Sequence, residues 1–330
     1  MSEGMSTESK ILESVLRPLA YWYSQDNVED VAINNPGGIW LRLRGKHQHP
    51  WHYYEDPKLT REYLTNVLYI IANSNNLPFD PVGGSPVVFS DLPGGHRFTG
   101  IAGRNVKYDN NDNLNGGVAM DIRVWREDNP ITFSDYNLEK DARLRPLNKL
   151  KGVEDPDDAF DRLVMYIKRG NHILISGGTA TGKTTFLNNM LKLLDIHKRV
   201  VTVEDVRELK VPHPNRVHVV LSRTEQTNAF DYKKVIDLAV RFTPDAILCG
   251  EISTGNAAAF WELMNTGHDS CFATIHADSA TEAYQAFFSR IQHSSPTPLD
   301  KEKTMKEMRD KVKVVQINRD GNIRAVTEIT

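Results

Sequence analysis

The residues best suited to chemistry lie in a glycine- and threonine-rich segment, which reads GGTATGKTT. Its first eight residues fit the P-loop pattern G-x-x-x-x-G-K-[ST], in which successive backbone N–H groups surround a phosphate. Lys183 is spaced to face the β- and γ-phosphates of a nucleotide, and the Thr184 hydroxyl to face a magnesium ion. We therefore expect a nucleoside-triphosphate site formed by Gly177, Gly178, Thr179, Ala180, Thr181, Gly182, Lys183, Thr184 and Thr185.

Three further polar side chains stand directly after short apolar runs and could join such a site. Glu251 follows the run 246–249, as the acid of a Walker B segment does, and could hold magnesium through water or accept a proton from the attacking water. Glu204, with Glu208 a few residues on, follows a second run and offers the same chemistry. His276 follows a third run and could hydrogen-bond a terminal phosphate. Taken singly, each could equally be an ordinary loop residue, and the pattern does not rank Glu204 against Glu251 as the base.

The segments around these residues alternate between strand-like and helix-like patterns. Short β-branched apolar runs indicate buried strands, and apolar residues at helical spacing indicate the helices between them. Such alternation predicts a parallel sheet covered by helices, in which ligands gather at the carboxyl ends of the strands. A first helix is expected to be capped by Asp155 and to end before Gly170. Beyond it we expect strands at 172–176, 199–204, 217–221, 246–249 and 270–275, and helices at 183–194, 231–241, 256–266 and 279–292.

The N-terminal part of the chain predicts a smaller α+β domain with a mixed or antiparallel sheet. Its expected helices lie at 7–23 and 60–73, and its expected strands at 28–34, 38–43, 86–90, 96–102 and 117–125. No catalytic motif lies here by itself. Arg97 and Arg123 stand on predicted strands, and on pattern alone they are ordinary surface charges. A polar, charged stretch at 128–153 follows and predicts a linker.

The composition bounds the class of protein. At 330 residues the chain is long enough for two domains. Its formal net charge of −3 gives no overall basic footprint, so direct binding of nucleic acid is not indicated. Cys249 and Cys271 lie in apolar runs and are expected to be buried, and no C-x-x-C pattern suggests zinc. No basic-then-apolar leader opens the sequence and no apolar run approaches a membrane span, so we expect a cytoplasmic protein.

Taken together, these motifs resemble the secretion ATPases of the type II/type IV secretion superfamily, and most of all the traffic ATPase of type IV secretion and conjugation systems. Four segments carry the resemblance in the family's order: the Walker A, Asp, Walker B and His boxes, at 177–185, 201–220, 241–252 and 266–279. The N-terminal part is similar more loosely, through VEDVAINNPGGIW, LPGGHRF and DIRVW.

The resemblance implies a fold and an assembly. A RecA-like P-loop ATPase domain at 154–330, closing with a helix and a hairpin, would be joined by the linker at 128–153 to the α+β domain at 1–127. The chain would form a homohexameric ring that hydrolyses ATP with Mg²⁺. The ring would power or gate substrate transfer, pilus assembly or both in a bacterial type IV secretion machine. It would lie at the cytoplasmic face of the inner membrane, in contact with other components of that machine.

The resemblance also implies roles for individual residues. Thr184 and Glu251 would hold the magnesium ion, Glu251 through water, and Glu204 matches the Asp-box glutamate often assigned as the base. Arg97 and Arg123 match N-terminal arginines that reach the bound phosphates, so they are expected to close over ATP from across the linker.

The chain departs from the family's usual pattern at a few positions. Ser253 and Asn256 stand where an arginine and a second glutamate often follow the Walker B acid, and Ala180 replaces a usual P-loop glycine. The absent C-x-x-C pair argues against the type II branch, which typically carries a zinc-binding tetracysteine segment. Two other readings are a small-molecule kinase, which leaves the N-terminal part and His276 without a role, and a nucleotide-gated scaffold with little turnover.

Overall fold

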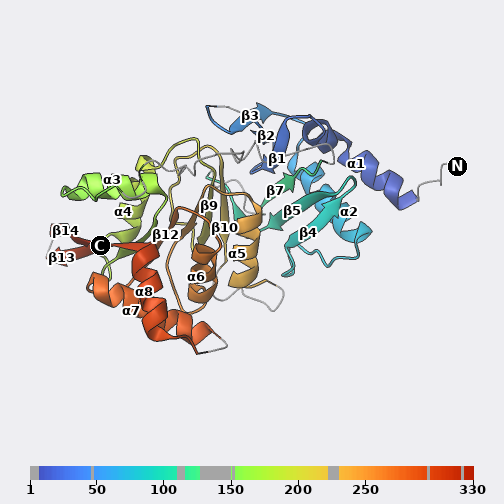
Figure 1. Ribbon diagram of the computed structural model, residues 1–330. Coiled ribbons are helices and arrows are strands. Elements are labelled where there is room, and N and C mark those ends of the chain that lie inside the picture. Colours follow the sequence, from blue (N-terminus) through green and yellow to red (C-terminus); the bar gives the residue numbers. More distant parts are fainter. Residues whose placement is uncertain are drawn as a thin grey trace, which may run out of the picture.

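The computed structural model describes residues 7–45, 48–109, 116–126, 150, 153–221, 230–295, 298–320 and 323–330. They form two sheets that lie beside each other, each with its own helices (Figure 1). One group of buried apolar side chains packs against the N-terminal sheet and two pack against the second sheet. The larger of these two also contains Val87, Ile101 and Ala119 of the N-terminal strands, so the two sheets share part of one core. The predicted linker at 128–153 falls outside the described residues except for residues 150 and 153, and its extent stays a prediction.

The N-terminal sheet has six strands in the order β3-β2-β1-β7-β5-β4, and every neighbouring pair in it is antiparallel. Helices α1 and α2 cover one face of this sheet, and the Thr60 hydroxyl caps α2 by accepting the backbone N–H of Tyr63. Strand β3, at the sheet edge, was not predicted. The elements are α1 (Thr7–Tyr23), β1 (Val28–Ile33), β2 (Gly38–Leu43), β3 (Trp51–Glu55), α2 (Arg61–Ser74), β4 (Val87–Leu92), β5 (His96–Gly103) and β7 (Gly117–Arg123).

The second sheet has eight strands in the order β14-β13-β8-β12-β11-β9-β10-β6. The six from β13 to β10 are parallel. Strands β8, β9, β11 and β12 are buried along their whole length, which explains their largely apolar sequences. The predicted parallel α/β sheet is confirmed. Its helices are α3 (Ala159–Arg169), α4 (Lys183–Met190), α5 (Tyr232–Arg241), α6 (Ala257–Asn265), α7 (Ala280–Ser294) and α8 (Lys301–Lys311). Its strands are β6 (Val106–Lys107), β8 (His172–Ser176), β9 (Val200–Glu204), β10 (Arg216–Val220), β11 (Ala246–Cys249), β12 (Cys271–Ile275), β13 (Val312–Asp320) and β14 (Ile323–Ile329).

One helix start differs from the sequence expectation. The side chain of Asp158, not that of Asp155, caps α3 by accepting the backbone N–H of Asp161. Asp155 instead accepts hydrogen bonds from the Tyr166 hydroxyl at 2.6 Å and from Arg169. The two carboxylates lie three residues apart, and the tertiary contacts of Asp155 decide which of them remains for the helix.

The N-terminal part contributes one strand to the second sheet. The short strand β6, which lies between β5 and β7 in the chain, pairs antiparallel with β10. Asn105 beside it exchanges backbone and side-chain hydrogen bonds with Val220. The edge of the parallel sheet is therefore closed by the N-terminal part of the chain.

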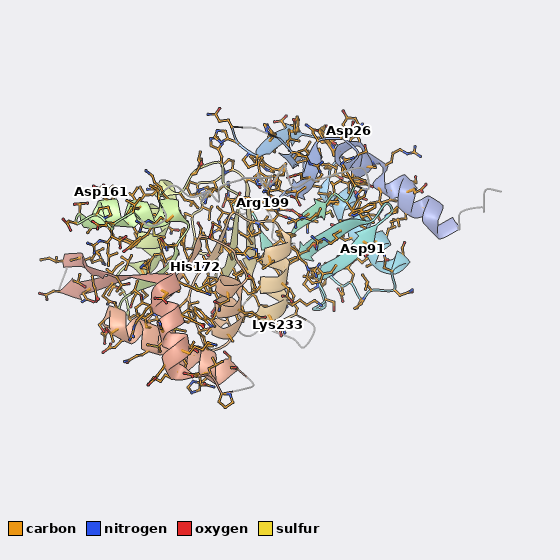
Figure 2. All side chains as sticks on the ribbon, viewed as in Figure 1. Asp26, Asp91, Asp161, His172, Arg199 and Lys233 are labelled. Atoms are coloured by element: carbon orange, nitrogen blue, oxygen red, sulfur yellow. The ribbon has the colours of Figure 1, made fainter. Side chains whose placement is uncertain are left out.

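A buried arginine joins the two sheets where they meet (Figure 2). Arg199, which precedes β9, is fully buried and forms an ion pair with Asp121 of β7. Its guanidinium lies 5.1 Å from the ring centre of Trp51 and 5.6 Å from that of Phe242. Burial raises the pKa of Asp121 to about 7, against the opposing charge of Arg199. The relative position of the sheets therefore rests on an ion pair that is costly to break.

Candidate nucleotide-binding site

The P-loop connects the carboxyl end of β8 to the start of α4, as the sequence predicts. Gly182 has a φ of +92°, and Ala180 adopts a left-handed φ of +60°. The tight turn is thus made without the usual glycine, at a cost of roughly 1–2 kcal/mol for a residue with a Cβ. A Cβ on Gly177 would lie 2.5 Å from the carbonyl oxygen of Ile317, so this position requires glycine because β13 passes so close.

The Lys183 ammonium lies inside the loop. It donates hydrogen bonds to the carbonyl oxygens of Gly177 at 2.9 Å and Gly178 at 2.8 Å, and its Nζ is 3.2 Å from Nδ1 of His276. Burial lowers the pKa of Lys183, and the nearby charge of Glu251 opposes that effect. Since the ammonium donates to Nδ1, a neutral His276 carries its own proton on Nε2.

The predicted Walker B carboxylate and the predicted His-box imidazole meet beside this lysine. Oε1 of Glu251 lies 3.6 Å from Nε2 of His276, and both side chains are 39% exposed. Asn256 fixes the turn that carries Glu251, because its amide donates to the Glu251 carbonyl at 2.8 Å and accepts the backbone N–H of Ser253 at 2.9 Å. The two residues that depart from the family's usual pattern therefore hold this turn in shape rather than bring charge to it.

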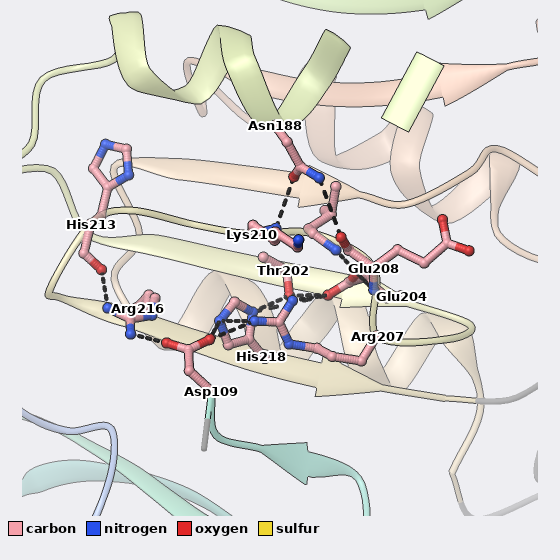
Figure 3. Close-up of polar contacts among 11 residues, drawn as sticks. Asp109, Asn188, Thr202, Glu204, Arg207, Glu208, Lys210, His213, Arg216 and His218 are labelled. Atoms are coloured by element: carbon pink, nitrogen blue, oxygen red, sulfur yellow. Dashed lines mark hydrogen bonds and ion pairs between the residues drawn. The ribbon is translucent and has the colours of Figure 1, made fainter. Parts of the chain in front are cut away.

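Glu204 lies in a different environment, as Figure 3 shows. Its side chain is only 1% exposed, and Oε1 accepts the backbone N–H groups of Glu208 at 2.8 Å and Leu209 at 2.7 Å. The Thr202 hydroxyl donates to Oε2 at 2.9 Å. Burial raises the pKa of Glu204, whereas these hydrogen bonds and Arg207 oppose the shift. The carboxylate is thus occupied in folding the loop that follows β9.

A chain of hydrogen bonds runs from Glu204 to the N-terminal part (Figure 3). Thr202 lies 2.9 Å from Nδ1 of His218, whose Nε2 is 2.7 Å from the Arg207 guanidinium. Arg207 in turn donates to Asp109 at 2.8 Å. Because the Thr202 proton is committed to Glu204, His218 must donate from Nδ1 and accept at Nε2, which requires a neutral ring. Burial and the charge of Arg207 accordingly hold the pKa of His218 well below its usual value.

Glu208 lies closer to the P-loop than its position in the sequence suggests. It is exposed, and its Oε2 lies 3.4 Å from the Thr184 hydroxyl, the group that the P-loop pattern assigns to magnesium. Asn188 of α4 ties the same loop to the P-loop helix through the backbone of Glu208 and Lys210. Only the folding of this loop onto α4 reveals the position of Glu208, although an acid four residues after Glu204 was a visible signal.

The structure does not bring Arg97 and Arg123 to the P-loop of their own chain. Arg123 forms an ion pair with Asp30 at 2.9 Å and donates to the Thr243 hydroxyl at 3.2 Å, and Arg97 lines the same small cavity. Thr243 precedes the amino end of β11, whereas Glu251 follows its carboxyl end. The two arginines therefore lie at the end of the parallel sheet opposite to the P-loop.

The carboxyl ends of four neighbouring strands thus supply a phosphate loop, a lysine, a hydroxyl, an imidazole and two accessible carboxylates. This set suits attack by water on a phosphoanhydride. The fold and the site together define a P-loop ATPase.

Comparison with known proteins narrows this class. Residues 137–292 match the family described as "Type II/IV secretion system protein". The chain is 28% identical over 310 residues to the type IV secretion system protein PtlH of Bordetella pertussis, covering 86% of this chain and 83% of that protein. It is 25% identical over 306 residues to the type IV secretion system protein VirB11 of Bartonella quintana, covering 86% and 82%. The resemblance drawn from the four motifs is confirmed: this chain is similar to type IV secretion ATPases.

A solved structure shows the same fold. The VirB11 ATPase from the Brucella suis type IV secretion system, crystallised with sulphate, superposes with a TM-score of 0.83 over 98% of this chain and 95% of that one, at 23% identity. The predicted fold class is therefore confirmed.

Proposed function

We propose that this chain hydrolyses ATP to power or gate substrate transfer, pilus assembly or both in a bacterial type IV secretion or conjugation machine. The observation that carries the proposal is the meeting of Lys183, Glu251 and His276 at the P-loop. The names of the relatives, type IV secretion system proteins PtlH and VirB11, support the choice of machine.

Each residue of the site has a separate role in hydrolysis. The Lys183 ammonium neutralises charge on the β- and γ-phosphates, for which it exchanges its present bonds to the loop carbonyls. Glu251, half-exposed, accepts a proton from the attacking water. His276 donates from Nε2 to the terminal phosphate. Glu204 holds the following loop rather than acting as the base, because its lone pairs already accept protein N–H and O–H groups.

The site fits magnesium bound with nucleotide. The Thr184 hydroxyl and the Glu208 carboxylate lie 3.4 Å apart and are hard oxygen donors, the kind that Mg²⁺ prefers, and Glu251 could join through water. No cluster of three or more His, Cys, Asp or Glu that could hold a metal by itself occurs in the described residues. That agrees with an ion held largely by phosphate and water, which supplies Lewis-acid stabilisation when bound.

We further propose that Arg97 and Arg123 act on the nucleotide of a neighbouring copy in a homohexameric ring. They are cross-strand partners on β5 and β7, an arrangement in which like charges repel unless an anion lies between them. Asp30 balances Arg123, whereas Arg97 is exposed. Since their own P-loop lies at the far end of the sheet, a second chain must bring a phosphate to them. A ring of like copies provides such heterologous contacts.

The ring would work at the cytoplasmic face of the inner membrane, bound to other components of the machine. Within the part of the chain that the structure describes, no helix is long and apolar enough to cross a membrane. Attachment would then come through protein contacts or the membrane surface.

Phosphate release from ATP tests the proposal. Lys183→Ala should abolish turnover because it removes the charge facing the phosphates. Lys192→Ala, which removes an exposed lysine that follows α4 and donates to Asn189, should leave turnover unchanged. An accelerated loss of ATP on adding small-molecule acceptors would instead favour a kinase. Binding without turnover in the intact oligomer would favour a scaffold.

A further inference from the structure

One residue of strand β12 holds the turn that carries Glu251 on both sides of that carboxylate. The Thr274 hydroxyl donates to the carbonyl oxygen of Gly250 at 2.6 Å, and the Thr274 carbonyl accepts the backbone N–H of Ile252 at 2.8 Å. The Thr274 side chain is buried. The residues before and after Glu251 are therefore both bonded to a single position of the neighbouring strand.

Strand β12 also fixes where the P-loop and the imidazole lie relative to this turn. It pairs in parallel with β8, with Thr274 opposite Ile175, and β8 leads directly into the P-loop. His276 follows Thr274 by two residues. Its Nδ1 lies 3.2 Å from Nζ of Lys183, and its Nε2 lies 3.6 Å from Oε1 of Glu251. Thr274 thus links the carboxylate to the imidazole and to the strand before the P-loop.

The position of the Glu251 carboxylate depends on the backbone that carries it. Within the part of the chain that the structure describes, no hydrogen bond reaches its oxygens, and its ion-pair contact is with the half-exposed His276. Arg290 of α7 adds one more hydrogen bond to the turn, from its guanidinium to the Ile252 carbonyl at 2.8 Å. A general base must lie within hydrogen-bond reach of its water, so a shift of this turn by about 1 Å lowers the rate strongly.

From these contacts we infer that Thr274, assisted by Arg290, is a positioning residue for ATP hydrolysis. Its hydroxyl holds Glu251 at the place of the attacking water, in fixed geometry to His276 and the P-loop. The inference rests on the proposed function, in which Glu251 accepts a proton from that water. Because Thr274 acts only through Glu251, its loss affects the chemical step and leaves nucleotide binding intact.

Thr274→Val tests the inference because valine has nearly the shape of threonine and lacks its hydroxyl. The kcat for ATP should fall about tenfold, less than the loss of about a hundredfold or more expected on removing the base itself, while KM for ATP stays within about twofold. Thr274→Ser keeps the donor and should stay within about threefold of the wild-type kcat. Thr304→Val is the matched control, because Thr304 is also buried and its helix, α8, leads into β13 at the end of the sheet opposite to the P-loop.

A double-mutant cycle separates positioning from a general loss of structure. In the Glu251→Gln background, Thr274→Val should lower kcat by less than about twofold, because the base through which Thr274 acts is gone. Three results would overturn the inference: an unchanged kcat in Thr274→Val, an equal loss in both backgrounds, or a loss in Thr274→Ser as large as that in Thr274→Val.

A second variant covers the case in which Thr274→Val does not fold. Arg290→Met removes the hydrogen bond to the Ile252 carbonyl and should lower kcat about threefold alone and not in the Glu251→Gln background. No loss, or the same loss in both backgrounds, refutes the inference. A wild-type chain that releases no phosphate from ATP would refute the proposed function itself, whereas normal wild-type turnover with uncoupled variants refutes only the positioning role.

Discussion

Replacing the two candidate bases one at a time shows which of them has a structural role at this site and which has a catalytic role. Glu204→Gln and Glu251→Gln make the same chemical change in two different environments. The Glu204 carboxylate is buried and accepts hydrogen bonds from two backbone N–H groups and a hydroxyl. The Glu251 carboxylate is half-exposed and lies beside His276. We expect the first variant to lose stability and the second to lose turnover.

The magnitudes follow from those contacts. A hydrogen bond to a charged group contributes about 1.5–3 kcal/mol, and the glutamine keeps one oxygen for the two N–H groups, so Glu204→Gln should cost about 1–3 kcal/mol. At about 2–4 °C per kcal/mol for a unit of this size, Tm should fall by several degrees. Glu251→Gln, on an accessible side chain, should change stability by less than about 0.5 kcal/mol. Its hydrolysis rate should fall about a hundredfold or more, the usual scale for a general base.

Thermal unfolding and steady-state phosphate release, measured on the same preparations, provide the assay. Nucleotide binding should persist in both variants, which shows that the P-loop remains folded. A Glu204→Gln variant with wild-type Tm and a hundredfold loss of turnover would refute the reasoning, since it would make Glu204 the base. So would a Glu251→Gln variant that hydrolyses ATP normally.

Three further predictions concern the scaffold around the site. Ala180→Gly should keep or slightly raise Tm because glycine adopts a positive φ freely, whereas Ala180→Val should lower it; a clear loss in the glycine variant would contradict the strain at this position. The lowered pKa of His218 means that the stability its neutral ring contributes is present above pH 6.5 and is lost as the pH falls below it, by up to about 1.4 kcal/mol per pH unit. Denaturation midpoints at pH 7.5 and 5.5 should therefore differ more in wild type than in His218→Gln, and equal differences would refute this. Asp121→Asn leaves Arg199 buried without its ionic partner and should destabilise the protein by about 3–5 kcal/mol in chemical denaturation, with less than about 1 kcal/mol counting against the buried pair.

The sequence predicted what depends on local pattern. The P-loop, the strands of the parallel sheet and the acid after β11 follow from short segments whose spacing fixes their geometry. Because parallel strands end at one edge, Lys183, Glu251 and His276 could be expected to meet, and they do.

Contacts between segments that are far apart in the sequence could not be predicted from local pattern. Glu204 is occupied because the loop behind it folds back and presents two N–H groups, an event that no local pattern encodes. The position of Arg97 depends on how the two sheets meet. That placement rests on pairs such as Arg199 with Asp121 and Asn34 with Asn215, far apart in the chain. The sequence around Arg97 does not encode those pairs, so it could not predict where Arg97 lies relative to the P-loop.

Mixing two inactive variants tests the central claim, ATP hydrolysis at a site completed by a second chain. Lys183→Ala and Arg97→Ala should each bind poorly or turn over poorly alone. Co-assembled in equal amounts, with mixed assembly verified by two affinity tags, they should recover about a quarter of the wild-type rate, since half of the sites keep the lysine and half of those face a neighbour with the arginine. A mixed assembly that stays inactive would contradict the account and place both residues at the site of one chain.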